Sequence, residues 1–214
     1  MIAAMRAVVS LALISALGCG PGAARPAPMP MPPPAPLAEL RSPASFEVIV
    51  DRTRRSQALF GEIGRVLTHP RCVNCHPADD SPRQGELHAM HDPPVLRGAA
   101  GRGIPALPCA GCHQDRNVEL ARVPGAPDWH LAPRQMVWLD RTAGQICTQL
   151  VDPALNGGKT LAQLHDHLAH DGLVAWGWTP GSGRTPAPGT QAELAALFQA
   201  WIDTGAVCPQ EAVK

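Results

Sequence analysis

Apolar residues recur at helical spacing along one face of the segment from about residue 51 to residue 67. A charged run opens this segment and is followed by Leu59, Phe60, Ile63, Val66 and Leu67. Residues three and four positions apart lie on the same side of a helix, so this pattern predicts an amphipathic helix. Pro70 follows shortly afterwards, and we expect the helix to end before it.

Three further helices are indicated by capping signals at their N-termini. In each, a Thr hydroxyl stands three residues before a Gln or Glu that can reach back to the backbone. The pairs are Thr142 with Gln145, Thr160 with Gln163, and Thr190 with Glu193. The second helix should reach about Ala169, and Gly205 stands where a left-handed residue would end the third. The buried face of that third helix should consist of Leu194, Leu197, Phe198, Trp201 and Ile202.

The stretches between these helices are rich in Pro and Gly and show little periodicity. They cover residues 77–108, 123–133 and 173–189. Breakers of this density predict loops, and no segment alternates as a strand would. The expected fold class is mainly α, with long Gly/Pro-rich loops and little or no sheet.

The N-terminus has the features of an export signal. Residues 1–18 combine one charge, Arg6, with a short apolar run and small residues after it. Cys19 follows a sequence that resembles a lipobox, but Ala16 stands where Leu is usual, so lipidation at Cys19 and cleavage after Ala24 both stay open. We expect a signal peptide at 1–18, a Pro-rich linker at 19–45 and one folded domain at 46–214.

The composition of the chain argues against one class of partner and limits how its core can be filled. The formal net charge is zero, which gives no basic footprint for nucleic acid. Aromatic residues make up only 4% of the chain, against 24 Pro and 20 Gly. Such a chain has few large side chains for a core, and buried prosthetic groups could supply the missing apolar bulk.

Two Cys-x-x-Cys-His motifs carry the candidate chemistry, at residues 72–76 and 109–113. In a c-type haem site the two thiols add across the vinyl groups and the adjacent His binds the iron. The motifs therefore predict two covalently bound haem c groups, held by Cys72, Cys75 and His76 and by Cys109, Cys112 and His113. The segment between the motifs is too short for a second cytochrome domain, so we expect one cytochrome-c-like domain wrapped around two close haems.

Two other interpretations of the cysteines stay open. The four thiols could bind one structural Zn²⁺, although zinc does not require a His after each pair. A redox dithiol is also conceivable, but it expects a strand followed by a helix. The remaining pair, Cys147 and Cys208, is predicted to form a disulfide in an oxidising compartment.

The second axial ligands decide between electron transfer and catalysis. A His or Met on the far side closes the iron, whereas an open position can bind small molecules. We favour His91 for one haem, with Met90 and more weakly His88 as competitors, because a flexible loop can wrap over a haem face. For the other we favour His130, which lies in a rigid apolar segment. Further candidates are Met136, His165, His167 and His170, while His69 beside Pro70 is expected to be structural.

From about Arg71 to Pro209 the chain resembles a group of bacterial cytochrome-c-like proteins, some labelled isoquinoline 1-oxidoreductase subunit. The resemblance depends on both Cys-x-x-Cys-His motifs, Val95-Leu96-Arg97-Gly98, Pro124-Gly125-Ala126-Pro127, Trp129-His130-Leu131-Ala132-Pro133, His170-Asp171, Trp176-Gly177-Trp178 and Cys208-Pro209. It implies a haem protein that takes electrons from a molybdenum hydroxylase or a similar dehydrogenase.

These observations together predict an exported dihaem c-type cytochrome, an electron carrier subunit that relays single electrons between a dehydrogenase and the respiratory chain; whether it also acts as an enzyme stays open. We expect it in the periplasm or on the outer face of the cell envelope, with membrane contact only through a lipid at Cys19. The alternatives are a haem enzyme with one open iron, such as a peroxidase-like protein, and a zinc-binding envelope module.

Overall fold

The computed structural model describes residues 39–210. The export signal at 1–18, Cys19 and the linker up to residue 38 lie outside the described residues. The described part is mainly helical, as expected, and its strands form only two short hairpins. The elements are η1 (Pro43–Phe46), α1 (Arg52–Leu67), α2 (Pro70–Val73), β1 (Arg83–Gln84), β2 (Ala89–Met90), β3 (Gly103–Ile104), β4 (Leu107–Pro108), η2 (Cys109–Gly111), η3 (Glu119–Ala121), α3 (Ala143–Val151), α4 (Leu161–His170), α5 (Gly172–Ala175), η4 (Trp176–Trp178) and α6 (Gln191–Asp203).

The three helices with predicted capping signals begin at those caps, and α1 begins after Asp51, for which no cap was predicted. The Asp51 carboxylate accepts a hydrogen bond from the Arg54 amide at the start of α1. Thr142 and Thr160 form reciprocal capping boxes at α3 and α4. The Thr190 hydroxyl accepts from the Glu193 amide at the start of α6. These caps satisfy amides that would otherwise have no partner in the first helical turn.

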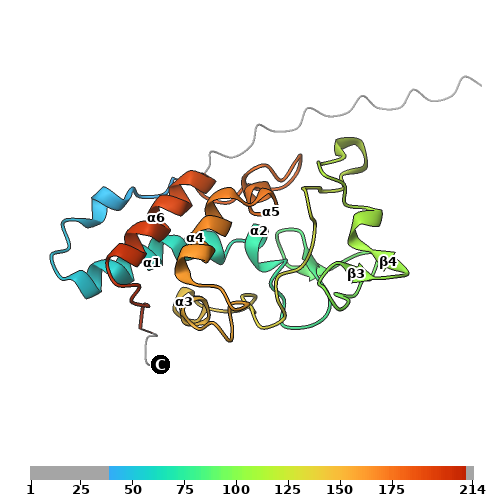
Figure 1. Cartoon of the computed structure of the whole chain (residues 1–214). Helices are drawn as coiled ribbons and strands as arrows, with labels where there is room; N and C mark the ends of the chain where they lie inside the picture. The colour runs from blue at the N-terminus through green and yellow to red at the C-terminus, as the bar shows by residue number, and fades with distance from the viewer. Residues whose placement is uncertain (1–38, 211–214) are drawn as a thin grey trace, which may run out of the picture. The chain divides into compact units, whose positions relative to one another are not determined.

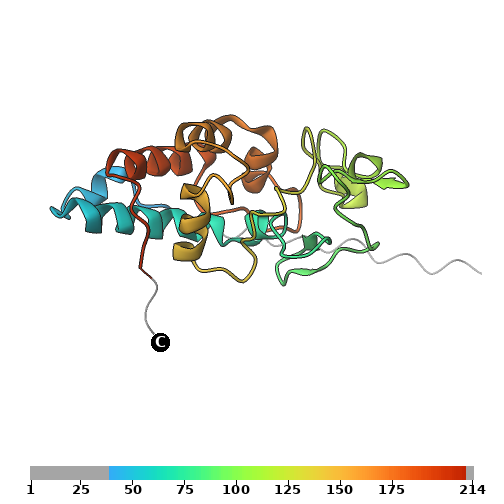
Figure 2. The same cartoon turned by 60° about the horizontal axis from the view of Figure 1, so that its bottom comes forward.

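The core lies between the helices. Helix α1 packs against α3 and α6, and α4 packs against α6. Figures 1 and 2 show these four helices side by side, with the segment of β3 and β4 on the other side of α2. Phe60 and Phe198 tilt against the fully buried ring of Trp201, at centroid distances of 4.9 and 5.0 Å. The predicted apolar faces of α1 and α6 therefore meet around one Trp side chain.

Two boundaries differ from the prediction. Folded structure already includes Leu40 and Arg41, several residues before Phe46. The Arg41 amide and Nε donate to the buried Glu62 carboxylate at 3.1 and 2.8 Å, which fixes this segment onto α1. The expected loop at 173–189 begins with two helical turns, α5 and η4, because Asp171 caps the amides of Leu173 and Val174.

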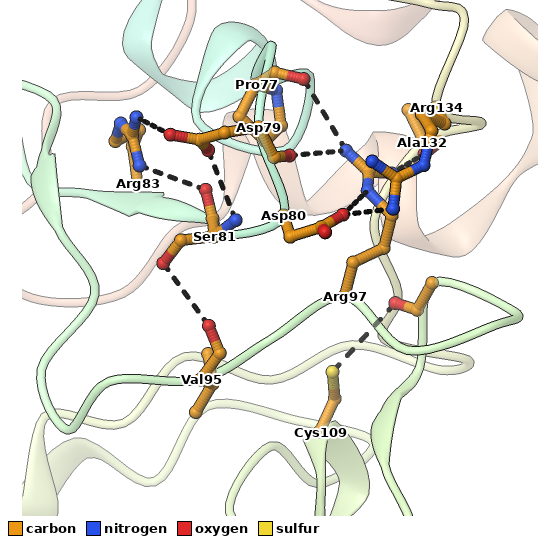
Figure 3. A network of polar contacts seen from close by, with 11 residues as sticks. Pro77, Asp79, Asp80, Ser81, Arg83, Val95, Arg97, Cys109, Ala132 and Arg134 are labelled. Carbon is orange, nitrogen blue, oxygen red and sulfur yellow. Dashed lines mark hydrogen bonds and ion pairs between the residues drawn. The ribbon is translucent and has the colours of Figure 1, made fainter.

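A buried arginine holds the long loops in place. Arg97, only 4% exposed, reaches from the loop between the motifs to the carbonyls of Ala132, Pro77 and Asp79. Figure 3 shows this guanidinium close to the Asp80 carboxylate, which also pairs with Arg134. One planar side chain thus satisfies several loop carbonyls that regular secondary structure would otherwise pair.

The disulfide between Cys147 and Cys208 is present, with the two Cα atoms 5.5 Å apart. It connects the buried face of α3 to the segment that follows α6. In residues 39–210, no helix is long and apolar enough to cross a membrane. The disulfide fits a protein that matures outside the cytoplasm.

Candidate functional site

The first motif forms directly after α1 because the sequence His69-Pro70 ends that helix and begins α2. His69 caps α2 through its ring, which accepts from the Arg71 amide, and Pro70 occupies the first turn, where its missing N–H is not needed. The backbone then continues in tight turns, from the Cys75 amide to the Cys72 carbonyl at 3.1 Å and from His76 to Val73 at 3.0 Å. This arrangement brings Cys72, Cys75 and His76 to the wall of one cavity.

The His76 ring is held in one orientation. Its Nδ1 lies 3.1 Å from the Met136 carbonyl, and because a carbonyl can only accept, Nδ1 carries the hydrogen. The ring lies parallel to the Trp138 indole, with centroids 3.5 Å apart. Burial lowers the pKa of His76 to about 3, against the smaller opposing effect of the Met136 bond. His76 is therefore a neutral imidazole whose Nε2 is free to bind a metal.

The second motif repeats this arrangement with different partners. It follows the β3–β4 hairpin, and the His113 amide donates to the Cys109 carbonyl at 2.9 Å. His113 Nδ1 donates to the Pro124 carbonyl at 2.7 Å, and its ring lies parallel to Trp129 with centroids 4.5 Å apart. Burial lowers the pKa of His113 as well. Both motif histidines thus present Nε2 and donate through Nδ1 to a loop carbonyl.

Gly125 permits the contact between His113 and the loop after it. A Cβ at Gly125 would collide with the backbone oxygens of Gln114 and Arg116. The Gly125 amide also donates to the Asn117 side chain at 3.0 Å. The close approach of these two backbone segments brings the neighbouring Pro124 carbonyl to His113.

Two cavities adjoin the motifs. The smaller, of about 340 Å³, is lined by Cys72, Cys75 and His76. The larger, of about 590 Å³, is lined by Cys75, Cys109, Cys112 and His113. Both volumes fall within the range of about 300–1,000 Å³ that small-molecule and cofactor sites occupy. Four residues line both cavities and form the wall between them: Arg71, Cys75, His130 and Trp176.

The cysteines of both motifs are free thiols, in contrast to the Cys147–Cys208 pair. Burial raises the pKa of Cys72 to about 12 and of Cys75 to about 11, so both carry hydrogen at neutral pH. In residues 39–210, no three or more His, Cys, Asp or Glu side chains are grouped as a metal ion would require. The four thiols thus do not form the tetrahedral cluster that the zinc interpretation needs.

Arg71 offers an unused donor between the cavities. Its side chain is 2% exposed and pairs with Glu86 at 2.7 Å, and its guanidinium lies over the Trp176 ring at 5.8 Å. Its Nε has no hydrogen-bond partner although it is buried. Buried polar groups are usually paired, so this nitrogen could bind an anionic group in either cavity. Haem carries two carboxylates, and the donor set therefore fits that cofactor.

The favoured second ligands both lie in cavity walls. His91 lines the larger cavity, and its ring centroid is 5.9 Å from that of His113. Both rings would therefore be near enough to hold one metal group bound in the larger cavity. His91 Nδ1 donates to the Pro93 carbonyl at 2.8 Å, which leaves Nε2 free. His130 lines both cavities, and its Nδ1 donates to the Asp128 carbonyl at 2.5 Å.

The competitors are placed differently. Met90 is 57% exposed with its sulfur 2.8 Å from Arg83 Nη1, and His170 pairs with Asp166 in solvent; neither lines these cavities. Met136 lines the smaller cavity, but its carbonyl accepts from His76. His88 bonds to Asn74 at 2.8 Å.

The sequence did not indicate that Trp138 and Trp129 stack on the motif histidines, or that the carbonyls of Met136 and Pro124 accept from them. Neither the stacking nor the choice of carbonyl leaves a pattern in the sequence. Trp176 meets Trp129 edge-on at 4.9 Å and lines both cavities. Comparison of the chain with protein-family models, with curated proteins and with solved structures gave no match.

Proposed function

We propose that this chain is a dihaem c-type cytochrome that relays single electrons in the bacterial cell envelope. The free thiols would hold each haem by adding S–H across its vinyl groups, sulfur to one carbon and hydrogen to the other, without net oxidation. Haem, when bound, supplies a one-electron iron couple. Cys72 and Cys75 would hold the first group and Cys109 and Cys112 the second.

One observation carries the proposal, namely the repeated environment of His76 and His113. Each follows two free thiols, faces a cavity, donates through Nδ1 to a carbonyl and lies parallel to a Trp. Donation through Nδ1 orients the ring and strengthens Nε2 as a metal ligand. Two independent sets of loop residues produce the same arrangement, which is hard to explain for histidines with only a packing role.

The wall that the two cavities share supports electron transfer between two bound groups over the binding of two groups that act separately. Cys75 lines both cavities, so a group bonded to it would adjoin the second cavity. His91 and His130 offer second imidazoles, and a closed iron favours electron transfer over substrate binding.

The resemblance to proteins labelled isoquinoline 1-oxidoreductase subunit suggests a molybdenum hydroxylase as electron donor. The disulfide supports maturation outside the cytoplasm, and a lipid at Cys19 would anchor the chain to the envelope.

Haem content and spin state test the proposal. The full chain, exported in a host that matures c-type cytochromes, should contain two haems by intact mass and by pyridine haemochrome. C72S/C75S and C109S/C112S should each retain one haem. Spectra that do not respond to carbon monoxide support the carrier. One high-spin iron that binds carbon monoxide supports the enzyme alternative, and a colourless protein with bound zinc would refute both.

A further inference from the structure

His167 lies in the wall of the smaller cavity, which it shares with Cys72, Cys75 and His76. It belongs to α4, whose Leu164 and Leu168 are buried in the core. A ligand on a packed helix is held more rigidly than one on a loop.

The ring of His167 is oriented by a carboxylate that is itself fixed. Asp171 Oδ1 accepts from the amides of Leu173 and Val174 at 2.8 and 3.1 Å, where it caps α5. Its other oxygen, Oδ2, lies 3.3 Å from His167 Nδ1. One Asp therefore joins two helices and directs one imidazole, a pairing that is common behind metal-binding histidines.

The other histidines of this region are less suited to the smaller cavity. His130 belongs to a loop, bonds to a carbonyl two residues before it and stands in the wall common to both cavities. His170 pairs with Asp166 in solvent, and His165 lies outside both cavity walls. Met136 also lines this cavity, but its backbone carbonyl is bonded to His76 Nδ1 and not to the free Nε2.

We propose that His167 is the second axial ligand of the haem held by Cys72, Cys75 and His76, and that Asp171 positions it. This proposal depends on the dihaem function above. Both irons would then have two imidazole ligands, because His91 remains beside His113 in the larger cavity. Two imidazoles favour low spin and a lower potential than His with Met.

The test compares variants of the full exported protein by haem count, absorption and electron paramagnetic resonance. H167A should retain two haems by pyridine haemochrome, but one should become high-spin and bind carbon monoxide. Added imidazole should restore low spin. H167M still offers a ligand and should keep low spin with a raised potential, which a purely structural His would not produce. The control H165A, on the same helix, should be unchanged.

D171N keeps a capping side chain but removes the charge behind the imidazole. It should retain two low-spin haems and raise the potential of one, because the ligand becomes less basic. The proposal is overturned if H167A keeps two low-spin haems that do not bind carbon monoxide. It is also overturned if H130A loses one low-spin haem while H167A is unchanged. Haem counts of zero or one in the wild-type protein would instead refute the dihaem function, so the two failures are distinguishable.

Discussion

At the scale of single residues, the least expected feature is a buried carboxylate, that of Glu62, which forms ion pairs with two arginines. Its side chain is 2% exposed and pairs with both Arg41 and Arg65. Burial alone would raise its pKa, but the hydrogen bonds from Arg41 and Arg65 and the charge of Arg65 together outweigh burial, and the pKa lies below the ordinary 4.5. A buried carboxylate needs such partners because it has lost its hydration.

We predict that E62Q lowers the free energy of unfolding by about 2 kcal/mol at neutral pH, the range for hydrogen bonds to charged groups. The folded-state pKa is depressed, so the contribution of Glu62 is complete above about pH 4.5 and is lost as pH falls through the folded pKa. The difference between wild type and E62Q should therefore shrink in acid. Guanidinium unfolding at several pH values measures it. The exposed Glu47 provides the control E47Q, and a difference that grows in acid would contradict the assignment.

The motif histidines show what a sequence can and cannot indicate at this scale. The Cys-x-x-Cys-His spacing marked His76 and His113 directly, because the chemistry requires those residue types in that order. Their acceptors are the backbone carbonyls of Met136 and Pro124. Every residue has a carbonyl, so only the folded chain reveals which one is used.

At the scale of elements, helix starts were predictable and loop contacts were not. The capping residues Asp51, Thr142, Thr160 and Thr190 act on amides within three residues, so local sequence contains the whole signal. Helix α5 was missed because residues 173–189 were expected to form a loop, whereas Asp171 caps a new turn that begins at Gly172. Loop contacts such as those of Arg97 join distant segments and leave no periodic pattern.

The loop after the second motif provides an element-scale prediction. G125A should cost roughly 2 kcal/mol of stability, because its Cβ would collide with two backbone oxygens that cannot move aside easily. The same substitution at the exposed helical Gly61, which has open space around it, should instead stabilise by about 1 kcal/mol. Thermal or guanidinium unfolding of both variants makes the comparison. Equal effects at the two sites would contradict the close approach at Gly125.

At the scale of the whole described chain, the disulfide connects the middle of the helical part to the segment after its last helix. Cys147 and Cys208 are 61 residues apart and join α3 to the segment after α6. We predict that C147S/C208S loses about 4 kcal/mol in the chain-entropy model, plus any cost of burying the serine hydroxyls. Guanidinium midpoints of variant and oxidised wild type measure the loss. Reduced wild type is the matched control and should agree with the variant. A loss under about 1 kcal/mol would contradict the prediction.

The wall shared by the two cavities should couple the two redox sites. Arg71, Cys75, His130 and Trp176 line both cavities, so only single side chains separate the two sites, and charges in such partly buried positions are screened much less than exposed ones. Adding an electron to one site then disfavours adding it to the next. We predict a wild-type redox titration broader than one single-electron step, and narrow single-step curves for C72S/C75S and C109S/C112S. Low-temperature electron paramagnetic resonance should show magnetic coupling that both variants lose. Wild-type curves and spectra that equal the sum of the two variants would show independent sites and contradict the shared wall.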